Sequence, residues 1–265
     1  MDLAWLMPTL AALGGVLLVT FLFFFATTRG ALIVRSWMPG VKAPDAHVYP
    51  IYSRMGLIRL IDFQPIIAAI LLFQYDRLVR IMTHVMSKMD LRGKKALITS
   101  CAFGNVMPCV TRAALRAGAD KVQVVDIIEN ELTNAESKMR EYRPSLEFFR
   151  RDAAHVGLPD GSVDVNVIFF LLHELPNELK NVVLEEACRV LAPGGKLFLG
   201  EFHRPHSLLM RMLSWTYFKV FEPWGLALWD THDPMAVLSA IPGMQCERRL
   251  AFFGNYQMII ATKQT

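Results

Sequence analysis

Two aspartates stand at the ends of successive predicted strands, where they could bind a nucleoside. Asp126 ends the apolar stretch 121–125, and Asp152 follows the next such stretch, 146–150. A carboxylate offers paired acceptors, so Asp126 could bind both ribose hydroxyls and Asp152 could accept a hydrogen bond from an adenine amino group. Acidic residues are common in loops, so each aspartate alone says little. The two within one repeating pattern predict a nucleoside-binding site.

A second group of ionisable side chains follows the later predicted strands. His173 and Glu174 come after the stretch 163–170, while Glu201 and His203 come after 196–200 on alternate positions that share one face. Imidazole and carboxylate groups can act as general bases or bind a divalent metal through hard N and O donors. We therefore predict all four as catalytic candidates, and His173, Glu201 and His203 as candidate metal ligands. The alternative is that His173 only packs or supports its neighbours.

An alternation of strands and helices must position these residues. From about Lys94 the chain shows predicted strands at 96–99, 121–125, 146–150, 163–170 and 196–200, with helices at 106–117, 129–140 and 176–191 between them. The nearly continuous apolar run VDVNVIFF (163–170) is typical of a central parallel strand covered on both faces. This order predicts an α/β fold with a Rossmann-like, doubly wound, mostly parallel sheet. A last strand is expected near 258–262.

The composition excludes several other classes of protein. The 265 residues are 53% hydrophobic and 20% charged, which excludes disordered and fibrous chains. The four cysteines form no CxxC pair, so we expect reduced thiols and no disulfide framework. The net charge is +4, but Lys and Arg are scattered, so nucleic-acid binding has little support. A mild positive charge suits anionic lipid headgroups.

The N-terminal residues predict a membrane anchor. No charged residue occurs in 3–28, and a run of this length can cross roughly 30 Å of hydrocarbon. Because Arg29, Arg35 and Lys42 follow it, the positive-inside rule predicts a single span in the inner membrane with the following domain on the cytoplasmic side. The basic start of a cleaved signal peptide is missing, and the run is too long for one.

The expected organisation therefore has three parts. Residues 1–28 form the anchor, 29–90 a linker and helical cap, and 91–265 the Rossmann-like domain with an aromatic insertion around 206–240. A second apolar run, 66–73, is too short to span a bilayer. We expect it to form a buried helix of the domain, with an interfacial helix as the alternative.

The later part of the chain resembles a known family. The stretch RDAAHVGLPDGSVDVNVIFFLLHELPNELKNVVLEEACRVLAPGGKLFLGEFHRP (151–205) is similar to the second half of class I S-adenosylmethionine (SAM) methyltransferases, and most of all to membrane-associated enzymes that methylate ubiquinone and menaquinone rings. The run RVLAPGGKLFLGEF (189–202) is its most specific part, and the resemblance covers about half of the chain. It implies SAM as ligand and a reacting centre near His173. The implied SAM contacts are Ser100, Cys101, Ala102, Phe103, Gly104, Asp126, Ile127, Asp152, Ala153 and Phe169.

The turn after the first predicted strand departs from that family. A methyltransferase normally carries an acid and a Gly-x-Gly-x-Gly turn here, which lets the backbone approach the methionine part of SAM. This chain has ITSCAFG (98–104), so Ile98 replaces the acid, and Ser100 and Ala102 replace two glycines. The added side chains fill the space of the methionyl tail, and the SAM ammonium loses a partner. Either this is an ordinary methyltransferase that has drifted, or SAM binds in an altered pose and donates something other than methyl.

A narrower resemblance favours the second alternative. An N-terminal anchor with SCAFGN (100–105), VVD (124–126) and LLHELP (171–176) resembles the rhodoquinone biosynthesis proteins, the RquA family. That family replaces a ring methoxy group of ubiquinone with an amino group, for anaerobic respiration. The resemblance implies SAM as amino donor, a divalent metal, manganese, as requirement, and ubiquinone in the bilayer as substrate.

Substrate contacts and rival functions complete the expectations. Tyr52 lies just past the linker, and Trp215, Phe218 and Trp224 belong to an aromatic segment that could cover the quinone ring and its isoprenoid tail. One alternative is a conventional SAM-dependent quinone methyltransferase. Another is a non-catalytic binding or assembly subunit with a SAM fold, against which the retained Asp126, Asp152 and His173 argue.

Overall fold

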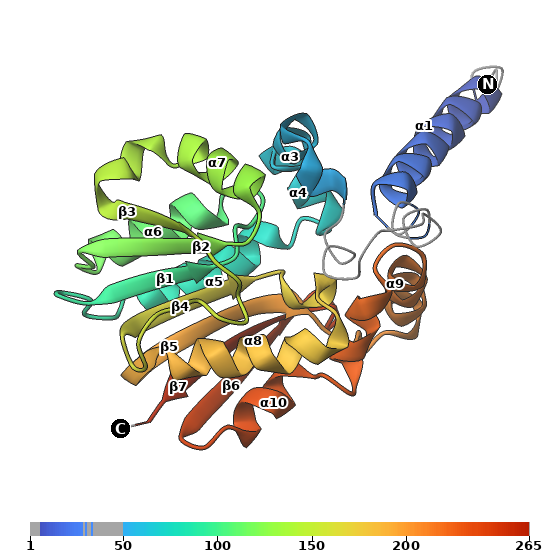
Figure 1. The fold of residues 1–265 in the computed structure, drawn as a ribbon. Helices are drawn as coiled ribbons and strands as arrows, with labels where there is room; N and C mark the ends of the chain where they lie inside the picture. The colour runs from blue at the N-terminus through green and yellow to red at the C-terminus, as the bar shows by residue number, and fades with distance from the viewer. Residues whose placement is uncertain (1–5, 29, 31–32, 34–49, 265) are drawn as a thin grey trace.

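A seven-stranded mixed sheet forms the centre of the molecule (Figure 1). The computed structural model describes residues 6–28, 30, 33 and 50–264. The strand order is β3-β2-β1-β4-β5-β7-β6; β1 to β5 run parallel, β7 runs antiparallel to β5, and β6 antiparallel to β7. The strands are β1 (Lys95–Thr99), β2 (Lys121–Asp126), β3 (Leu146–Arg150), β4 (Val163–Phe169), β5 (Leu191–Phe202), β6 (Met244–Ala251) and β7 (Tyr256–Lys263). The predicted α/β, doubly wound, mostly parallel fold is confirmed.

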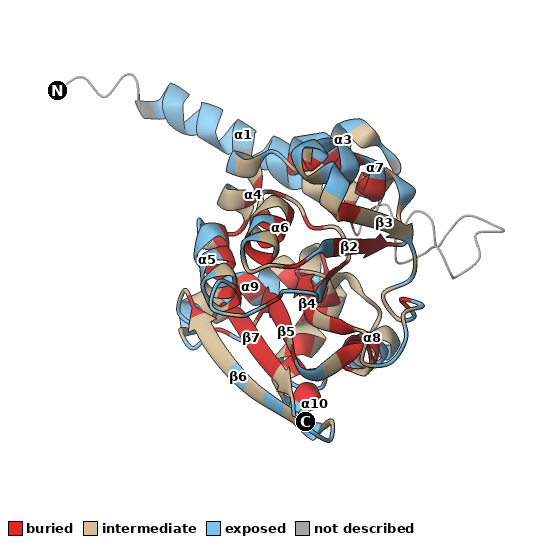
Figure 2. Cartoon of the chain, turned by 90° about the vertical axis from the view of Figure 1, so that its left-hand side faces the viewer, coloured by how far each residue is buried: buried red, intermediate tan, exposed pale blue. Residues whose placement is uncertain are grey.

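Helices cover both faces of this sheet, because the central strands carry apolar side chains on both sides. Figure 2 shows the buried residues gathered along the strands and on the helix faces that meet them. One face packs against α5 (Tyr75–Met86), α6 (Val106–Arg116) and α7 (Glu129–Lys138). The other face packs against α8 (Asn177–Arg189) and α10 (Pro234–Ala240). In β4, Val165 and Val167 point to the first layer and Ile168 to the second.

One strand, β6, was not predicted from the sequence. β6 lies at the edge of the sheet and carries Glu247, Arg248 and Arg249 in its middle. Charged side chains are typical of edge strands, because they discourage pairing with another chain, but they also remove the apolar run by which a strand is recognised. The remaining predicted strands and helices are present, and β5 begins earlier and ends later than expected.

A helical cap precedes the sheet. It consists of the short helices η2 (Pro50–Ser53), α3 (Met55–Ile61) and α4 (Gln64–Ile70). The apolar run 66–73 is divided: Ile67 and Leu71 are buried, whereas Leu72 and Phe73 are 41% and 76% exposed. Burial of this run is therefore confirmed for one side only, since its C-terminal end reaches solvent.

Helix α1 (Leu6–Thr27) projects from the domain (Figure 1). It is the one helix among the described residues that is long and apolar enough to cross a membrane. Its C-terminal end approaches α9 (Leu208–Val220), where the rings of Phe21 and Phe221 lie 5.4 Å apart. The residues on which the predicted orientation depends, Arg29, Arg35 and Lys42, lie outside the described part of the chain.

Candidate functional site

A cavity opens at the carboxyl ends of β1, β2, β4 and β5, the edge at which parallel sheets bind ligands. The turn after β1 and the residues after β2 form one end of it. The segment after β4, with Phe202, forms the other end. The cap covers it, together with Phe24 and Thr28 at the end of α1. The cavity therefore reaches from the sheet to the predicted membrane anchor.

The turn after β1 keeps a left-handed backbone without most of its glycines. Ser100 has a φ of +72°, and Gly104 a φ of +74°. A non-glycine residue in this region is strained by about 1 kcal/mol or more. At Gly104 a Cβ atom would lie 2.7 Å from Gln64 Oε1 and 2.8 Å from the Tyr75 hydroxyl, so the cap requires glycine there. Phe103 stacks on Tyr52 of the cap, with ring centroids 5.9 Å apart.

The backbone N–H groups at the start of α6 are already bonded. Those of residues 104–106 donate to side chains of the cap and α5, at 2.8 Å in each case: Asp62, Gln64 and Tyr75. A helix N-terminus normally offers such groups to an anionic ligand group. Here the protein uses three of them itself.

The carbonyl groups of the same turn are also occupied. Lys138 of α7 donates from Nζ to the carbonyl oxygens of Ala102 (3.2 Å) and Gly104 (3.0 Å), and it pairs with Asp62 at 2.7 Å. Asp62 also accepts from the Asn134 amide at 2.9 Å. This network ties the cap, the turn and α7 together, and it leaves fewer backbone groups for the amino-acid end of a ligand.

Asp126 is held rigidly at the end of β2. Its Oδ2 accepts from the Cys101 N–H at 2.7 Å and from the Ser100 hydroxyl at 3.1 Å, and its Oδ1 accepts from the Ile128 N–H at 2.8 Å. Burial raises the pKa of the carboxyl group, and these donors oppose the rise. Because Oδ1 accepts only one of these hydrogen bonds, it has a second lone pair with which the carboxylate can still accept from a ribose hydroxyl.

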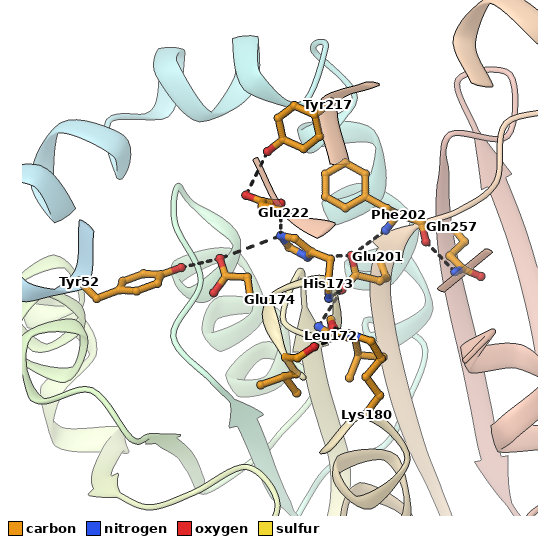
Figure 3. A network of polar contacts seen from close by, with 11 residues as sticks. Tyr52, Leu172, His173, Glu174, Lys180, Glu201, Phe202, Tyr217, Glu222 and Gln257 are labelled. Carbon is orange, nitrogen blue, oxygen red and sulfur yellow. Dashed lines mark hydrogen bonds and ion pairs between the residues drawn. The ribbon is translucent and has the colours of Figure 1, made fainter. Parts of the chain in front are cut away.

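At the opposite end, buried Glu201 orients His173 (Figure 3). Glu201 Oε1 lies 3.0 Å from His173 Nδ1 and accepts from the Phe202 N–H at 2.7 Å. Its Oε2 accepts from the N–H groups of Leu172 (2.9 Å) and His173 (3.3 Å). Glu201 is fully buried and does not line the cavity, so it can act only through His173.

The other ring nitrogen of His173 faces two further carboxyl groups. Nε2 lies 3.4 Å from Glu222 Oε2 and 4.0 Å from Glu174 Oε1. Burial alone disfavours the charged imidazole, but Glu201 and Glu222 outweigh it and raise the pKa of His173 to about 9. Burial raises the pKa of Glu174 to about 7, although the Tyr52 hydroxyl donates to it at 2.5 Å. An imidazolium thus stands beside a carboxyl group that titrates near neutral pH, which is suited to acid–base chemistry.

The structure brings together most of the predicted site residues. The cavity is lined by Tyr52, Ser100, Cys101, Ala102, Phe103, Asp126, Ile127, Asp152, Ala153, Phe169, His173 and Glu174. Gly104 lies behind its wall, against the cap. Three aromatic candidates are elsewhere: Trp215 is half exposed on α9, Phe218 is buried in the core, and Trp224 is not part of the lining.

The candidate metal ligands do not converge. His203 bonds through Nδ1 to the Gly254 carbonyl oxygen at 2.7 Å, and its Nε2 lies 3.2 Å from the Arg248 guanidinium group. Both ring nitrogens are engaged away from the cavity. Within the described residues, no group of three or more His, Cys, Asp or Glu side chains is arranged to hold a metal ion. The set His173, Glu201 and His203 therefore does not fit a metal.

Several residues of the cavity and its walls were not predicted from the sequence. Glu222, which lines the cavity, follows α9 within an aromatic segment, and Tyr217 donates to it at 3.1 Å. Glu131 and Lys138 lie seven residues apart on one helix, a spacing common to many solvent-facing charges. Only the path of the chain brings these side chains to His173 and to the turn after β1.

Comparison with known proteins agrees with this fold. The carbon methyltransferase CurJ has a TM-score of 0.63 at 17% identity, covering all of this chain and 72% of that chain. A SAM-dependent methyltransferase from Aquifex aeolicus has a TM-score of 0.54 at 17% identity, covering 79% of this chain and 98% of that chain. At such identities the likeness shows the fold alone, which is the Rossmann-like fold of class I SAM methyltransferases.

Sequence relatives are more specific. The chain is similar to the demethylmenaquinone methyltransferase of Bacillus licheniformis, 30% identical over 132 residues (50% of this chain, 55% of the relative). It is also similar to the demethylmenaquinone methyltransferase of Lactococcus lactis, 32% identical over 157 residues (58% and 60%). The chain thus matches less than two thirds of these relatives' length. The model of the ubiE/COQ5 methyltransferase family matches residues 62–233, and the chain belongs to that family.

Proposed function

We propose that this chain transfers the amino group of SAM to ubiquinone, replacing a ring methoxy group and forming rhodoquinone. The observation that carries the proposal is the turn after β1. Its left-handed backbone carries Ser100, its carbonyl groups bond to Lys138, and the N–H groups of residues 104–106 bond to the cap. These contacts disfavour the methyl-donor pose of SAM and support a different placement of its amino-acid end.

The other end of the cavity supplies the acid and base that this reaction needs. As an amine attacks the ring carbon, a C–N bond forms and negative charge collects on the quinone carbonyl oxygen. Methoxide then leaves with the electrons of the C–O bond, and the aminoquinone is still joined to SAM through its Cα–N bond. Loss of the Cα proton passes two electrons to the quinone and gives a quinol imine, and water cleaves this imine to rhodoquinol, the reduced form of rhodoquinone, and the 2-oxo acid derived from SAM. Glu174, with a pKa of about 7, can take the proton from the amine, and His173, with a pKa of about 9, can give one to methoxide as methanol departs. The same imidazolium can stabilise the carbonyl oxygen.

A substrate dissolved in the bilayer explains the surface around the cavity. Most of the large exposed apolar side chains outside α1 gather at the α3–α4 cap, in the turn that follows it and on α9. They are Leu60, Phe63, Leu72, Phe73, Leu208, Leu209, Met212, Leu213 and Trp215. Phe24 and Thr28 of α1 line the cavity itself. We propose that α1 anchors the chain in the inner membrane with the domain on the cytoplasmic side, and that the quinone enters from the bilayer.

The metal requirement and the second candidate function both come from likeness to known proteins. A manganese requirement is implied by the RquA-like segments, but the donors expected for it do not converge, and the mechanism assigns no step to a metal. Conventional methylation of a quinone is the second candidate, and the similarity to demethylmenaquinone methyltransferases favours it. In that reaction SAM supplies the methyl carbon and Glu174 would deprotonate the acceptor.

One labelling experiment separates the two candidates. The full chain, in liposomes that contain ubiquinone and a demethylated quinone acceptor, is incubated with manganese and SAM carrying ¹⁵N in its amino group and ¹³C in its methyl group. The quinones are then analysed by mass spectrometry. The proposal expects ¹⁵N in an aminoquinone that has lost one methoxy group. Transfer of ¹³C to a demethylated quinone acceptor, without ¹⁵N product from ubiquinone, would identify a methyltransferase instead.

A further inference from the structure

Glu131 of α7 is a buried carboxyl group of the cavity with an unused acceptor. The residue is 3% exposed and lines the cavity, and its Oε1 has no hydrogen-bond partner among the residues that the structure describes. A buried polar atom without a partner costs free energy, so an orphaned oxygen facing a cavity points to a group that arrives with the ligand.

The surroundings of Glu131 make that group a cation. Burial, and next the nearby Asp126, raise the pKa of Glu131 to about 9, while Lys138 opposes the rise. The titratable groups around it come from the elements that enclose this end of the cavity: Tyr52, Asp62, Cys101, Asp126, Lys138 and Glu174. Acids outnumber the single amine among them. An added positive charge would therefore be stabilised, and an added negative charge would be repelled.

The turn after β1 cannot receive a cation well. Ile98 is buried in the core, so no carboxylate stands at the end of β1. Two carbonyl groups of the turn, those of Ala102 and Gly104, already accept from the Lys138 ammonium group. A ligand ammonium group would compete with Lys138 there, whereas the free oxygen of Glu131 has no competitor among the described residues.

We propose that Glu131 binds the ammonium group at the amino-acid end of SAM. This inference rests on the proposed function for the identity of the ligand. At neutral pH Glu131 is a neutral carboxylic acid before SAM binds. When the ammonium group of SAM arrives, the carboxyl group loses its proton to solvent and forms a carboxylate–ammonium pair. Binding of SAM should thus release a proton, because the ammonium group adds a positive charge that lowers the pKa of Glu131.

Titration calorimetry with two ligands tests this assignment. 5′-Deoxy-5′-methylthioadenosine keeps the nucleoside and the sulfur of SAM but lacks the amino-acid end. For the full chain in detergent, Glu131→Gln should weaken SAM binding at least tenfold and change methylthioadenosine binding less than twofold. At pH 7.5, titrations in two buffers of different ionisation enthalpy should show release of up to one proton with SAM. No release is expected with methylthioadenosine, or with the variant.

Matched variants complete the test. Glu129→Gln, on the same helix with an exposed side chain, should change neither affinity. Equal weakening of both ligands by Glu131→Gln would indicate a structural role and overturn the inference, as would unchanged SAM affinity. Because all readouts are binding measurements, failure of the amination reaction would overturn the proposed function without altering them.

Discussion

At the turn after β1 the cavity wall offers few free polar groups, whereas at the rim after β4 it concentrates them. The first end holds Asp126 in a fixed pose and bonds its own backbone to the cap and to Lys138. The second end places His173 among three glutamates, and their charges raise its pKa to about 9. Under the proposed function, the first end would bind the nucleoside of SAM and the second would carry out the proton transfers. A variant at one end should affect ligand affinity, and a variant at the other should affect turnover.

The largest expected effect comes from His173. His173→Gln keeps a polar side chain but removes the proton donor, so ubiquinone amination should fall by about 10²- to 10⁴-fold. SAM affinity, measured by calorimetry, should change less than about twofold, since the nucleoside end of the cavity is untouched. Turnover near the wild-type rate would mean that the reaction does not take place at the rim after β4.

Asp126 tests the opposite end. Asp126→Asn removes the charge of the acceptor proposed for the ribose, and a charge-assisted hydrogen bond contributes about 1.5–3 kcal/mol. SAM affinity should therefore fall about 10- to 100-fold by calorimetry. Asp152→Asn, whose side chain is exposed at the cavity edge, serves as control and should have a smaller effect. If the Asp126 variant binds SAM normally, the nucleoside does not lie at β2.

Glu201 should act only through the charge of His173. The raised pKa means that the folded protein holds this proton more tightly than the unfolded chain, whose histidine titrates near 6.5. The resulting stability is full below about pH 6.5 and is lost as pH rises through about 9. Glu201→Gln should flatten this decline in the free energy of unfolding, measured by denaturation at several pH values.

The same substitution provides a kinetic check. With the glutamate charge gone, the upper limb of the pH–rate profile should move to lower pH, because His173 loses its proton earlier. In the stability measurement, buried carboxyl groups such as Glu174, whose pKa is raised, also make the wild-type protein less stable as pH rises. The effect of Glu201→Gln on stability is therefore read from the difference between variant and wild type. An unchanged pH–rate profile would show that the protonation of His173 does not control the rate.

If the quinone ring reacts at the rim after β4, the quinone must enter the cavity from the bilayer. Leu209→Glu with Leu213→Glu on exposed α9 should lower turnover several-fold with long-chain ubiquinone in liposomes, because charges weaken insertion of an apolar helix face. Turnover with a short-chain, water-soluble quinone should stay unchanged. Val182→Glu, an exposed site on α8, is the matched control. Equal loss with both quinones would indicate damage to the fold.

The smallest effect is expected where glycine is restored. Ser100→Gly relieves a strained backbone but removes the hydrogen bond from its hydroxyl to Asp126, which contributes about 1 kcal/mol. SAM affinity should fall about fivefold, and the combined Ser100→Gly and Ala102→Gly variant should not reach wild-type amination. Full activity of the double variant would show that these side chains are incidental to the altered pose.

Much of the fold, and part of the cavity, could be predicted from local patterns. Apolar runs mark β1 to β5 and β7, because strands covered on both faces must be apolar throughout. Acidic residues at the ends of these strands, such as Asp126, could be predicted as site residues from their position in the sequence alone. β6 was missed because its charged edge carries no such run. His203 was placed wrongly beside His173, because its place after β5 does not show that Gly254 and Arg248 engage its ring.

The layered α/β architecture, the apolar N-terminal helix and the loss of glycines after β1 can all be recognised in the amino-acid sequence, since each depends on neighbouring residues. The electrostatics of the cavity, in contrast, depend on the tertiary structure. Tyr52 reaches Glu174, and Glu222 reaches His173, from segments distant in the sequence, and Lys138 reaches the turn after β1 from α7. The pKa of a buried group depends on burial and on charges a few ångströms away. Those neighbours are chosen by the packing of the whole chain, and no local pattern records them.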